Sequence, residues 1–554
     1  MFVTTPSLLP VIPDPTDPVS FDEERPLLAV REGIHYKPHQ VTGIRWMLDR
    51  ERSDAPLCRG GVLADDMGLG KTFQTIGLML NGAAGMRTLI VCPPALMAGW
   101  TAELTACGFF VSTLFDGAAH WKPAPKEWPT DRVVWLATYP RICMYHSVLM
   151  RSGEGRFDRV VLDEGHAIRN GFKTARGLAC LKIAWFASCR WILSATPVQN
   201  GFRDWANICM WLRVACKRSE LAAAAEVLML RRTMAELRCD GVTDLPPAPV
   251  FVVRDLSIPE EEKAEETART DSEFRYFHAL CDKLEDVLDD RHVSALAKLE
   301  LYMRIQQFLV HPQIYIEGRP ERAERPWTGG ATKWSACVEG DLAEAVRDRV
   351  GTIVFCQFRR EMDLVATAAR GMGAAVWSVR GGMSVAEVGA AVEGGRVAVA
   401  EGKAVVMVVQ IVSGGVGLNL QFCQRVLFLS QHWNPAVVHQ AVGRAVRIGQ
   451  KEVVRVFMYR VVDDVMDNLD LRMTAIHAGK IGVAKELCSS FYEGFGGAAT
   501  ALPSASAATA VPTQPNIGEA NVRAGGPAKL ALPSASAATD TVTEDSEDPM
   551  VSED

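Results

Sequence analysis

Residues 65–80 read DDMGLGKTFQTIGLML, a glycine-rich turn followed directly by a helical pattern. Gly68 and Gly70 allow backbone amides to approach phosphate oxygens, and the helix that follows turns its positive end toward them. Lys71 then reaches the β- and γ-phosphates of a nucleotide, and the Thr72 hydroxyl binds Mg²⁺. A phosphate loop normally has glycine where this chain has Asp65, so a chance glycine-rich turn stays an alternative. The residues predicted to hold the nucleotide here are Asp65, Asp66, Met67, Gly68, Leu69, Gly70, Lys71 and Thr72.

Apolar, strand-like runs alternate with helical stretches in the part of the chain that follows this turn. One set is RTLIVCPP (87–94), RVVWLAT (132–138), RVVLDEGH (159–166) and RWILSATP (190–197). A second set is TIVFCQF (352–358), AAVWSV (374–379), AVVMVVQ (404–410), RVLFLSQ (425–431) and VRVFMYR (454–460). Continuous apolar runs separated by helices predict parallel sheets covered on both faces, with ligands at the carboxyl ends of the strands. The fold class predicted is therefore α/β, with two lobes.

Two carboxylates follow one of these strands. Asp163 and Glu164 come directly after the apolar run RVVL. At the end of a strand, Asp163 suits Mg²⁺ binding and Glu164 suits orienting and deprotonating an attacking water. An ordinary acidic turn after a strand is the alternative.

Two arginines stand close together in QAVGRAVRIGQ, residues 440–450. On a helix, Arg444 and Arg447 would share a face and point into one cleft. Two guanidinium groups aimed at phosphates would neutralise charge that develops in a transition state. Plain surface arginines are the alternative.

Changes in composition divide the chain into five parts. These are an arm (1–30), a first lobe (31–215), a charge-rich helical insertion (216–330), a second lobe (331–490) and a low-complexity tail (491–554). The tail contains ALPSASAAT twice and ends in an acidic stretch, a composition that predicts disorder.

Charge and cysteine usage narrow the class of protein. The 554 residues carry a formal net charge of -7, and residues 540–554 alone hold seven acids and no base. The rest of the chain is thus near neutral, so nucleic-acid binding would depend on local basic clusters. None of the fourteen cysteines are paired at C-x2-C spacing, which speaks against structural zinc and a disulfide scaffold. The longest apolar run, 404–420, is interrupted by polar residues and glycines, and we expect no membrane span.

Taken in order, the motifs resemble those of the Swi/Snf-type ATPases of helicase superfamily two, over roughly 31–480. In the first lobe they are YKPHQVTGIRWM (36–47), ADDMGLGKT (64–72), LIVCPPALMAGW (89–100), DEGHAIRN (163–170) and SATPVQN (194–200). LRRT (230–233) and RIQQFLVHP (304–312) follow, and then FCQFRREMDL (355–364), SGGVGLNL (413–420), HWNP (432–435) and 440–450. HWNP followed by RIGQ separates this family from RNA-directed helicases.

The resemblance implies two tandem RecA-like lobes that clamp ATP and Mg²⁺ and act on double-stranded DNA. It implies that Gln40 reads adenine and that Gln440 joins Arg444 and Arg447 in the catalytic set. Trp433 would contact DNA, although a core tryptophan is an equal alternative. Segment 461–487 resembles the helical brace of the family.

Basic residues beside the motifs are candidates for phosphate contacts. Arg359 and Arg360 are proposed to bind DNA, with plain surface charges as the alternative. The chain departs from the family pattern at Val446, at Ala195 and in GGMS (381–384). None of these departures removes a group assigned to phosphate chemistry, so we expect hydrolysis to be kept.

The function expected is an ATP-dependent translocase on double-stranded DNA, in chromatin remodelling or DNA repair, that remodels or displaces nucleosomes or other DNA-bound proteins. It would act in the nucleus, or at the site of DNA replication if the source is viral. A strand-separating DNA helicase and a non-hydrolysing DNA- or chromatin-binding scaffold are the alternatives. Intact Lys71, Glu164 and both arginines speak against the scaffold.

Overall fold

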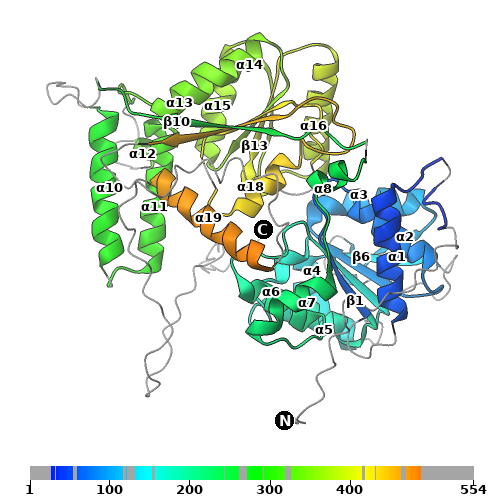
Figure 1. Ribbon diagram of the computed structural model, residues 1–554. Helices are drawn as coiled ribbons and strands as arrows, with labels where there is room; N and C mark the ends of the chain where they lie inside the picture. The colour runs from blue at the N-terminus through cyan, green and yellow to red at the C-terminus, as the bar shows by residue number, and fades with distance from the viewer. Residues whose placement is uncertain are drawn as a thin grey trace, which may run out of the picture.

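The computed structural model has two α/β lobes, with a pair of long helices beside the second (Figure 1). It describes residues 27–487 apart from 32, 54–58, 117–119, 122–131, 152–155, 243, 261–270, 291, 319–325, 415–417, 431 and 463–468. The predicted tail and, except for residues 27–30, the predicted arm lie outside the described residues.

The first lobe is built on a seven-stranded parallel sheet with the order β3-β6-β2-β7-β8-β1-β9. The strands are β1 (Arg59–Leu63), β2 (Thr88–Cys92), β3 (Phe110–Thr113), β6 (Val133–Thr138), β7 (Arg159–Asp163), β8 (Cys189–Leu193) and β9 (Met229–Leu230). All residues of β2, β7 and β8 are buried, as expected of strands covered on both faces. A short hairpin, β4 (Phe115–Asp116) and β5 (His120–Trp121), lies outside this sheet.

Helices cover both faces of the first sheet. Residues that alternate along the strands pack on one face against α1 (Pro38–Arg52), α2 (Lys71–Asn81) and α3 (Met97–Ala106). The opposite face packs against α4 (Tyr139–Arg151), α5 (Ala175–Ile183), α6 (Phe202–Trp211) and α7 (Leu221–Leu228). The carboxyl ends of the central strands therefore stay open toward the loops that follow them.

The second lobe has a six-stranded parallel sheet with the order β10-β15-β14-β11-β13-β12. Its strands are β10 (Val250–Leu256), β11 (Thr352–Cys356), β12 (Ala375–Val379), β13 (Val405–Gln410), β14 (Arg425–Phe428) and β15 (Arg455–Val461). Its helical elements are α13 (Thr332–Trp334), a π-helical stretch (Ser335–Leu342), α14 (Ala343–Arg347), α15 (Arg359–Gly371), α16 (Val385–Ala400), α17 (Ile411–Gly414) and α18 (Pro435–Val442). Two parallel α/β sheets are thus confirmed, and they are consistent with tandem RecA-like lobes.

Two strands lie inside the segment 216–330 that we predicted as a helical insertion. β9 completes the first sheet beside β1, and β10 forms the edge of the second sheet beside β15. The predicted helices are present in the part of this segment that follows β10, as α10 (Glu273–Asp289), α11 (Ala295–Val310) and α12 (Pro312–Glu317). β9 has only two residues, which directly follow α7 (Leu221–Leu228), and only the first four residues of β10 are apolar, so neither run stands out as a strand in the sequence.

The last described helix, α19 (Leu469–Leu487), connects the parts of the molecule. It contacts α6 and α7 of the first lobe, α11, and α18 and β15 of the second lobe (Figure 1). Lys333 Nζ, on α13, lies 2.5 Å from Asp470 Oδ2, and both side chains are buried. This ion pair anchors the start of α19 to the second lobe.

The two lobes are in close contact. Buried residues of both lobes belong to one continuous apolar cluster, which includes Leu69 and Met234 of the first lobe and Val442 and Val446 of the second. Val446, one of the departures from the family pattern, is buried in this contact. None of the described helices is long and apolar enough to cross a membrane.

Candidate functional site

The turn of residues 64–70 joins β1 to α2. Gly68 and Gly70 have φ angles of 84° and 83°, a region that glycine adopts without strain. A Cβ atom on Gly70 would lie 2.3 Å from Gln40 Nε2, and one on Gly68 would lie 3.3 Å from the Cα atom of Arg447. Both glycines are therefore favoured by their conformation, and Gly68 is favoured also by the close approach of the Arg447 backbone of the second lobe.

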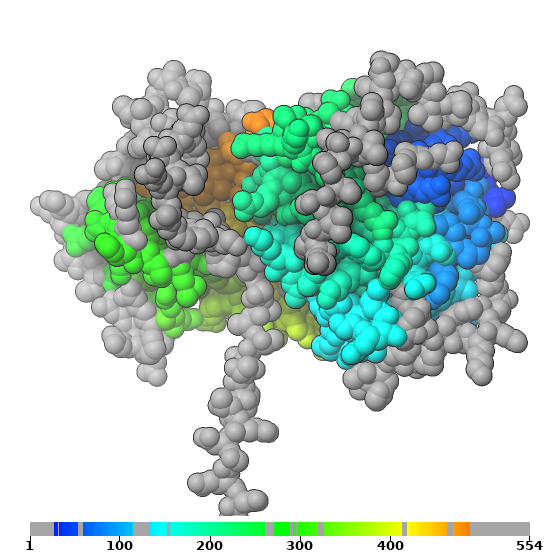
Figure 2. All heavy atoms as spheres, turned by 90° about the horizontal axis from the view of Figure 1, so that it is seen from below, coloured from blue at the N-terminus to red at the C-terminus, as the bar shows by residue number. Residues whose placement is uncertain are grey.

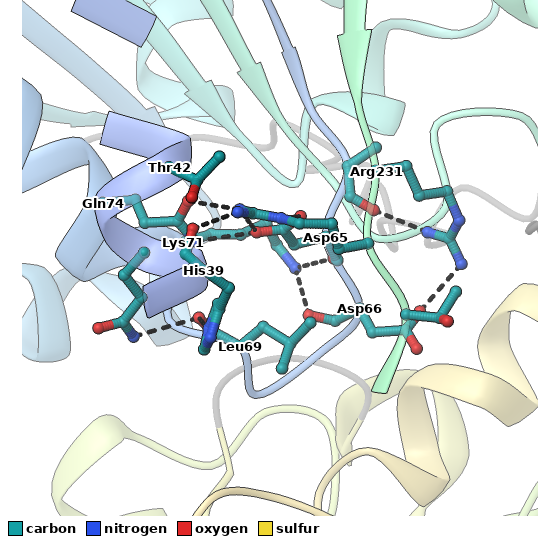
Figure 3. Close-up of polar contacts among 12 residues, drawn as sticks. His39, Thr42, Asp65, Asp66, Leu69, Lys71, Gln74 and Arg231 are labelled. Carbon is teal, nitrogen blue, oxygen red and sulfur yellow. Dashed lines mark hydrogen bonds and ion pairs between the residues drawn. The ribbon is translucent and has the colours of Figure 1, made fainter. Parts of the chain in front are cut away.

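Lys71 lies back over the turn that precedes it. Its ammonium donates to the carbonyl oxygens of Asp65 at 2.6 Å and Asp66 at 3.1 Å (Figure 3). Burial lowers the pKa of Lys71, while the carboxylates of Glu164 and Asp163 and the two loop aspartates act in the opposite direction. A cation thus stands at the mouth of the turn, surrounded by acids.

The carboxylates of Asp65 and Asp66 are held by two arginines that the sequence left without a role. Arg232 Nη2 lies 2.6 Å from Asp65 Oδ2. Arg231 Nη2 lies 2.9 Å from Asp66 Oδ1 (Figure 3). Both arginines belong to LRRT (230–233), which crosses the carboxyl edge of the sheet beside β1. The two ion pairs stabilise the shape of the turn, because each carboxylate is held in place by an arginine.

Gln40 and its neighbour His39 bind the same turn from α1. Gln40 Nε2 donates to the carbonyl of Leu69 at 3.3 Å, and the backbone N–H of Lys37 donates to Gln40 Oε1 at 3.0 Å. His39 Nε2 also donates to Leu69 O, at 3.1 Å. Gln40 is therefore placed beside the phosphate turn, as the resemblance implied, and His39 is an additional contact that sequence reasoning missed.

Asp163 and Glu164 lie at the carboxyl end of β7, next to the turn. The indole Nε1 of Trp100 donates to Asp163 Oδ2 at 2.7 Å, and the N–H of Glu164 donates to Asp163 Oδ1 at 2.9 Å. Burial, and then the charge of Glu164, raise the pKa of Asp163 to about 6. The two hydrogen bonds hold this carboxylate in one orientation, and a nearby cation would stabilise its ionised form.

Glu164 has a strained backbone and an acidic side chain. Its φ angle is 51°, a region that few residues other than glycine adopt. Burial alone would raise the pKa of Glu164, but His166, Arg444 and Lys71 together lower it. His166 Nδ1 lies 3.3 Å from Glu164 Oε2 and 3.2 Å from the hydroxyl of Ser194. Glu164 is thus kept ionised and aimed by its neighbours.

The arginines of the second lobe reach this place from a turn. The helix predicted for them was wrong, because α18 ends at Val442 and is capped at Gly443. Backbone bonds Arg444 N to Ala441 O and Ala445 N to Val442 O instead form tight turns. Gly443 lets this turn approach the phosphate loop, since a Cβ atom there would lie 3.0 Å from that of Met67.

Arg444 and Arg447 both lie at the junction between the lobes. Burial, opposed by the charges of Glu164 and Asp163, lowers the pKa of Arg444 to about 10. Arg447 Nη1 donates to the carbonyl of Leu418 at 3.3 Å, and burial lowers its pKa as well. The structure therefore brings both arginines to the edge of the predicted nucleotide site.

A chain of polar contacts crosses from one lobe to the other. The hydroxyl of Ser194, which contacts His166, accepts from the N–H of Thr196 at 3.3 Å. The hydroxyl of Thr196 in turn accepts from Gln440 Nε2 of the second lobe at 3.4 Å. Gln440 is thus joined to the neighbours of Glu164, and Ser194 and Thr196 belong to the motif SATPVQN.

The HWNP turn forms a second bridge between the lobes. Asn434 Nδ2 donates to Gln199 Oε1 of the first lobe at 2.9 Å, while its own Oδ1 caps α18. From the other side, α19 binds the backbone of the same turn. His477 Nε2 donates to the carbonyl of His432 at 2.5 Å, and Lys480 Nζ donates to that of Trp433 at 3.0 Å. The turn is therefore held by the first lobe and by α19 together.

The three residues predicted to contact DNA lie in different surroundings. Trp433 is half-buried and packs against the apolar cluster of α10, α11 and α19. Arg360, at the start of α15, makes a two-pronged ion pair with Glu317 of α12. Arg359 precedes it on α15 and is exposed. Of the three, Arg359 is therefore the exposed side chain to which no other described residue offers a hydrogen bond or ion pair.

These residues fit a nucleotide with its metal ion. Lys71, Arg444 and Arg447 provide cations for a polyphosphate, and Gly68 and Gly70 leave room for it to approach the backbone. Asp163 and Thr72 provide the oxygen ligands that Mg²⁺ prefers, from the end of β7 and the first turn of α2.

Comparisons with known proteins agree with this geometry. Residues 39–220 match the family model of the SNF2-related domain, and residues 338–449 match that of the helicase conserved C-terminal domain. The chain is similar to the "Probable global transactivator" of Orgyia pseudotsugata multicapsid polyhedrosis virus, with 28% identity over 79% of this chain and 88% of that protein.

Other relatives are longer. The chain is 23% identical to the "Chromodomain-helicase-DNA-binding protein 1-like" of Danio rerio, over 76% of this chain and only 41% of that protein. Among solved structures it is similar to the "Sulfolobus solfataricus SWI2/SNF2 ATPase core in complex with dsDNA", at 20% identity. That match covers 84% of this chain and 96% of the other, with a TM-score of only 0.35.

Proposed function

Because the chain belongs to the Swi/Snf-type ATPases, with an SNF2-related domain followed by a helicase C-terminal domain, we propose that it hydrolyses ATP to move along double-stranded DNA. The observation that carries this proposal is the meeting of four groups at the junction of the lobes. Lys71 and Glu164 come from the first lobe, and Arg444 and Arg447 come from the second. A site divided between two lobes can only act when both are in place.

Each of these groups has a proposed part in hydrolysis. Lys71 binds the β- and γ-phosphates, and Glu164 accepts a proton from the water that attacks the γ-phosphorus. Arg444 and Arg447 neutralise the charge that develops on the transferred group. Thr72 and Asp163 would hold Mg²⁺, which when bound neutralises phosphate charge and orients the phosphates.

Movement is proposed to follow from opening and closing of the cleft. The contacts of Thr196 with Gln440 and of Gln199 with Asn434 join the lobes, and we propose that they belong to the closed form. Release of hydrolysis products removes the charges that hold the arginines close, so the lobes can separate and one of them can shift along DNA. α19 contacts both lobes, which supports its proposed role as the helical brace.

Replacing Glu164 by glutamine tests the assignment of the base. We expect Glu164→Gln to keep ATP binding while hydrolysis falls by roughly 10²–10⁴-fold, the usual contribution of a positioned base. Phosphate release and binding of a fluorescent ATP analogue measure the two effects. Glu393→Gln is a matched control, since Glu393 lies on the exposed side of α16 and should have wild-type rates. Wild-type turnover in Glu164→Gln would remove this residue from the water-activating position.

The nucleic acid that stimulates the ATPase tests the proposed substrate. We expect duplex DNA to stimulate hydrolysis more strongly than single-stranded DNA or RNA, with nucleosomes as a further activator. A preference for RNA would contradict the proposal. Unwinding of a forked duplex, followed by fluorescence, would favour the strand-separating helicase instead. A chain that binds DNA without hydrolysing ATP would be a scaffold, which the full set of charged groups at the site speaks against.

The three residues proposed to contact DNA differ in how accessible their side chains are. Arg359 is exposed and suits a phosphate contact, whereas Arg360 would have to leave Glu317 and Trp433 would have to leave its apolar neighbours. We therefore propose Arg359 as the first of the three to test, with nucleosomes or other DNA-bound proteins as targets of the moving enzyme. The name of one relative includes DNA binding, which supports the proposal that this chain acts in the nucleus or at a site of DNA replication.

The C-terminal tail is proposed to be dispensable for basal hydrolysis. The sequence after residue 490 lacks apolar periodicity, and its acids repel DNA rather than attract it. Deleting 491–554 should leave the ATPase rate without DNA unchanged, measured at equal protein concentration. An insoluble or inactive product would show that the tail is part of the catalytic fold.

A further inference from the structure

An apolar surface of the first lobe lies away from the nucleotide site. Large hydrophobic side chains are exposed on α4, on α5 and on the 3-10 turn Ala184–Phe186 that follows α5. Met144 is 66% exposed, Trp185 57% and Phe186 50%, and Val148 and Leu178 are exposed beside them. A contiguous apolar patch on the surface of a protein often marks a binding site. Figure 2 shows this side of the lobe, in cyan.

The patch is hollowed, so it can hold a side chain. A cavity of about 460 Å³ opens between α4 and α5, with Met150, Leu178, Leu181, Trp185 and Phe186 in its walls. This volume lies within the range of roughly 300–1,000 Å³ that small ligands or several side chains occupy. We call this cavity and the exposed side chains around it the α4–α5 groove.

The charged residues of the helices that line the α4–α5 groove are all basic. α4, α5 and the turn after α5 contain Arg141, Arg151, Arg176 and Lys182, and no aspartate or glutamate. Lys182 lines the cavity itself, and the guanidinium of Arg156 lies 4.9 Å from the centre of the Phe186 ring. Among the described residues of this region, Asp158 is the nearby acid, and its Oδ2 already accepts from the N–H of Arg87. A partner should therefore be acidic and carry a few apolar side chains.

The chain itself contains a segment of that composition. Residues 540–554, DTVTEDSEDPMVSED, hold seven acids and no base, together with Val542, Met550 and Val551. We propose that this segment docks in the α4–α5 groove, with Met550 or Val551 in the cavity and its carboxylates near Lys182 and the arginines. This goes beyond the proposed ATPase and beyond the expected disorder of the tail.

The length of chain between the two places allows the contact. α19 ends at Leu487, against α6 and α7 of the same lobe. A chain of the 52 residues from 488 to 539 spans about 40 Å even at the dimensions of a random coil, and much more when extended. Docking adds no group to the nucleotide site, so it agrees with a tail that is dispensable for basal hydrolysis.

Zero-length carbodiimide cross-linking of the full chain, read by mass spectrometry, tests the proposal. We expect Lys182 to be joined to acids of 540–554, and Lys403, an exposed lysine of the second lobe, to be joined to them rarely. The double variants Trp185→Ser/Phe186→Ser and Met550→Ser/Val551→Ser keep every charge of the contact. Each should lower the Lys182 cross-link about tenfold, the step that ~1.4 kcal/mol of lost apolar contact produces.

Other results would overturn the proposal. Equal cross-linking of the tail to Lys182 and Lys403, or unchanged yields in both double variants, would mean that the acids collide with any surface lysine. Links from Lys182 to acids of residues 14–24 would make the other acidic end of the chain the occupant. Links between isotopically light and heavy copies would make it a second molecule. Basal ATPase rates of both double variants show whether the fold is kept, independently of the cross-links.

Discussion

ATP turnover by Lys71→Ala is expected to fall below detection, and ATP binding is expected to weaken. Lys71 lies among four carboxylates, those of Asp65, Asp66, Asp163 and Glu164, so its loss leaves an anionic pocket that repels phosphates. The neighbouring arginines of LRRT cannot replace it, because they are held by the loop aspartates.

The measurements are phosphate release and binding of a fluorescent ATP analogue, with and without duplex DNA. Lys403→Ala is the matched control, since Lys403 is an exposed lysine of the second lobe and its loss should change neither. Measurable turnover at wild-type affinity would show that the turn of residues 64–70 is only a glycine-rich connection, the alternative that the sequence left open.

Most of the two sheets could be predicted from the sequence, because their central strands are buried on both faces. β2, β7, β8, β11 and β13 are near-continuous apolar runs, and each lies where such a run predicted it. The edge strand β12 was predicted as well, but β9 and β10, at the edges of the two sheets, could not be read in this way. β9 has only two residues, and the apolar part of β10 is only four residues long (250–253), so neither run can be distinguished from a helical segment by its periodicity.

The phosphate turn of the first lobe could also be predicted from the sequence, but the residues that hold it in place could not. The residues of the phosphate turn are contiguous, and glycines mark the positions where the backbone must adopt positive φ. Arg231 and Arg232 support that turn from more than 150 residues away, and Trp100 holds Asp163 from another helix. Such pairs depend on which loops cross at the carboxyl edge of the sheet, and spacing along one chain does not contain that information.

For the two arginines of the second lobe, the sequence indicated the residues but not the local structure that carries them. Their spacing of three predicted a shared helical face, but the two glycines at 443 and 449 favour turns over a continued helix. The turn does what the helix was expected to do, since it brings Arg447 against Gly68 and Arg444 near Glu164. The two arginines were therefore proposed for a partly wrong reason, and their role stays a prediction that needs a direct test.

Arg447→Ala is expected to bind ATP nearly normally, to hydrolyse it about 10³–10⁵-fold more slowly, as loss of an arginine finger does, and to lose stimulation by duplex DNA. Arg447→Lys should not restore the rate, because lysine keeps the charge but loses the planar, two-pronged donor. If Arg447 served only to bind the carbonyl of Leu418, both variants would lose stability by about 1 kcal/mol and keep their rates. Arg396→Ala is the control, an exposed arginine on α16 whose removal should change stability by no more than about 0.5 kcal/mol. DNA-stimulated turnover and melting temperature of the three variants distinguish these cases, and unchanged turnover in both Arg447 variants would exclude this residue from the site.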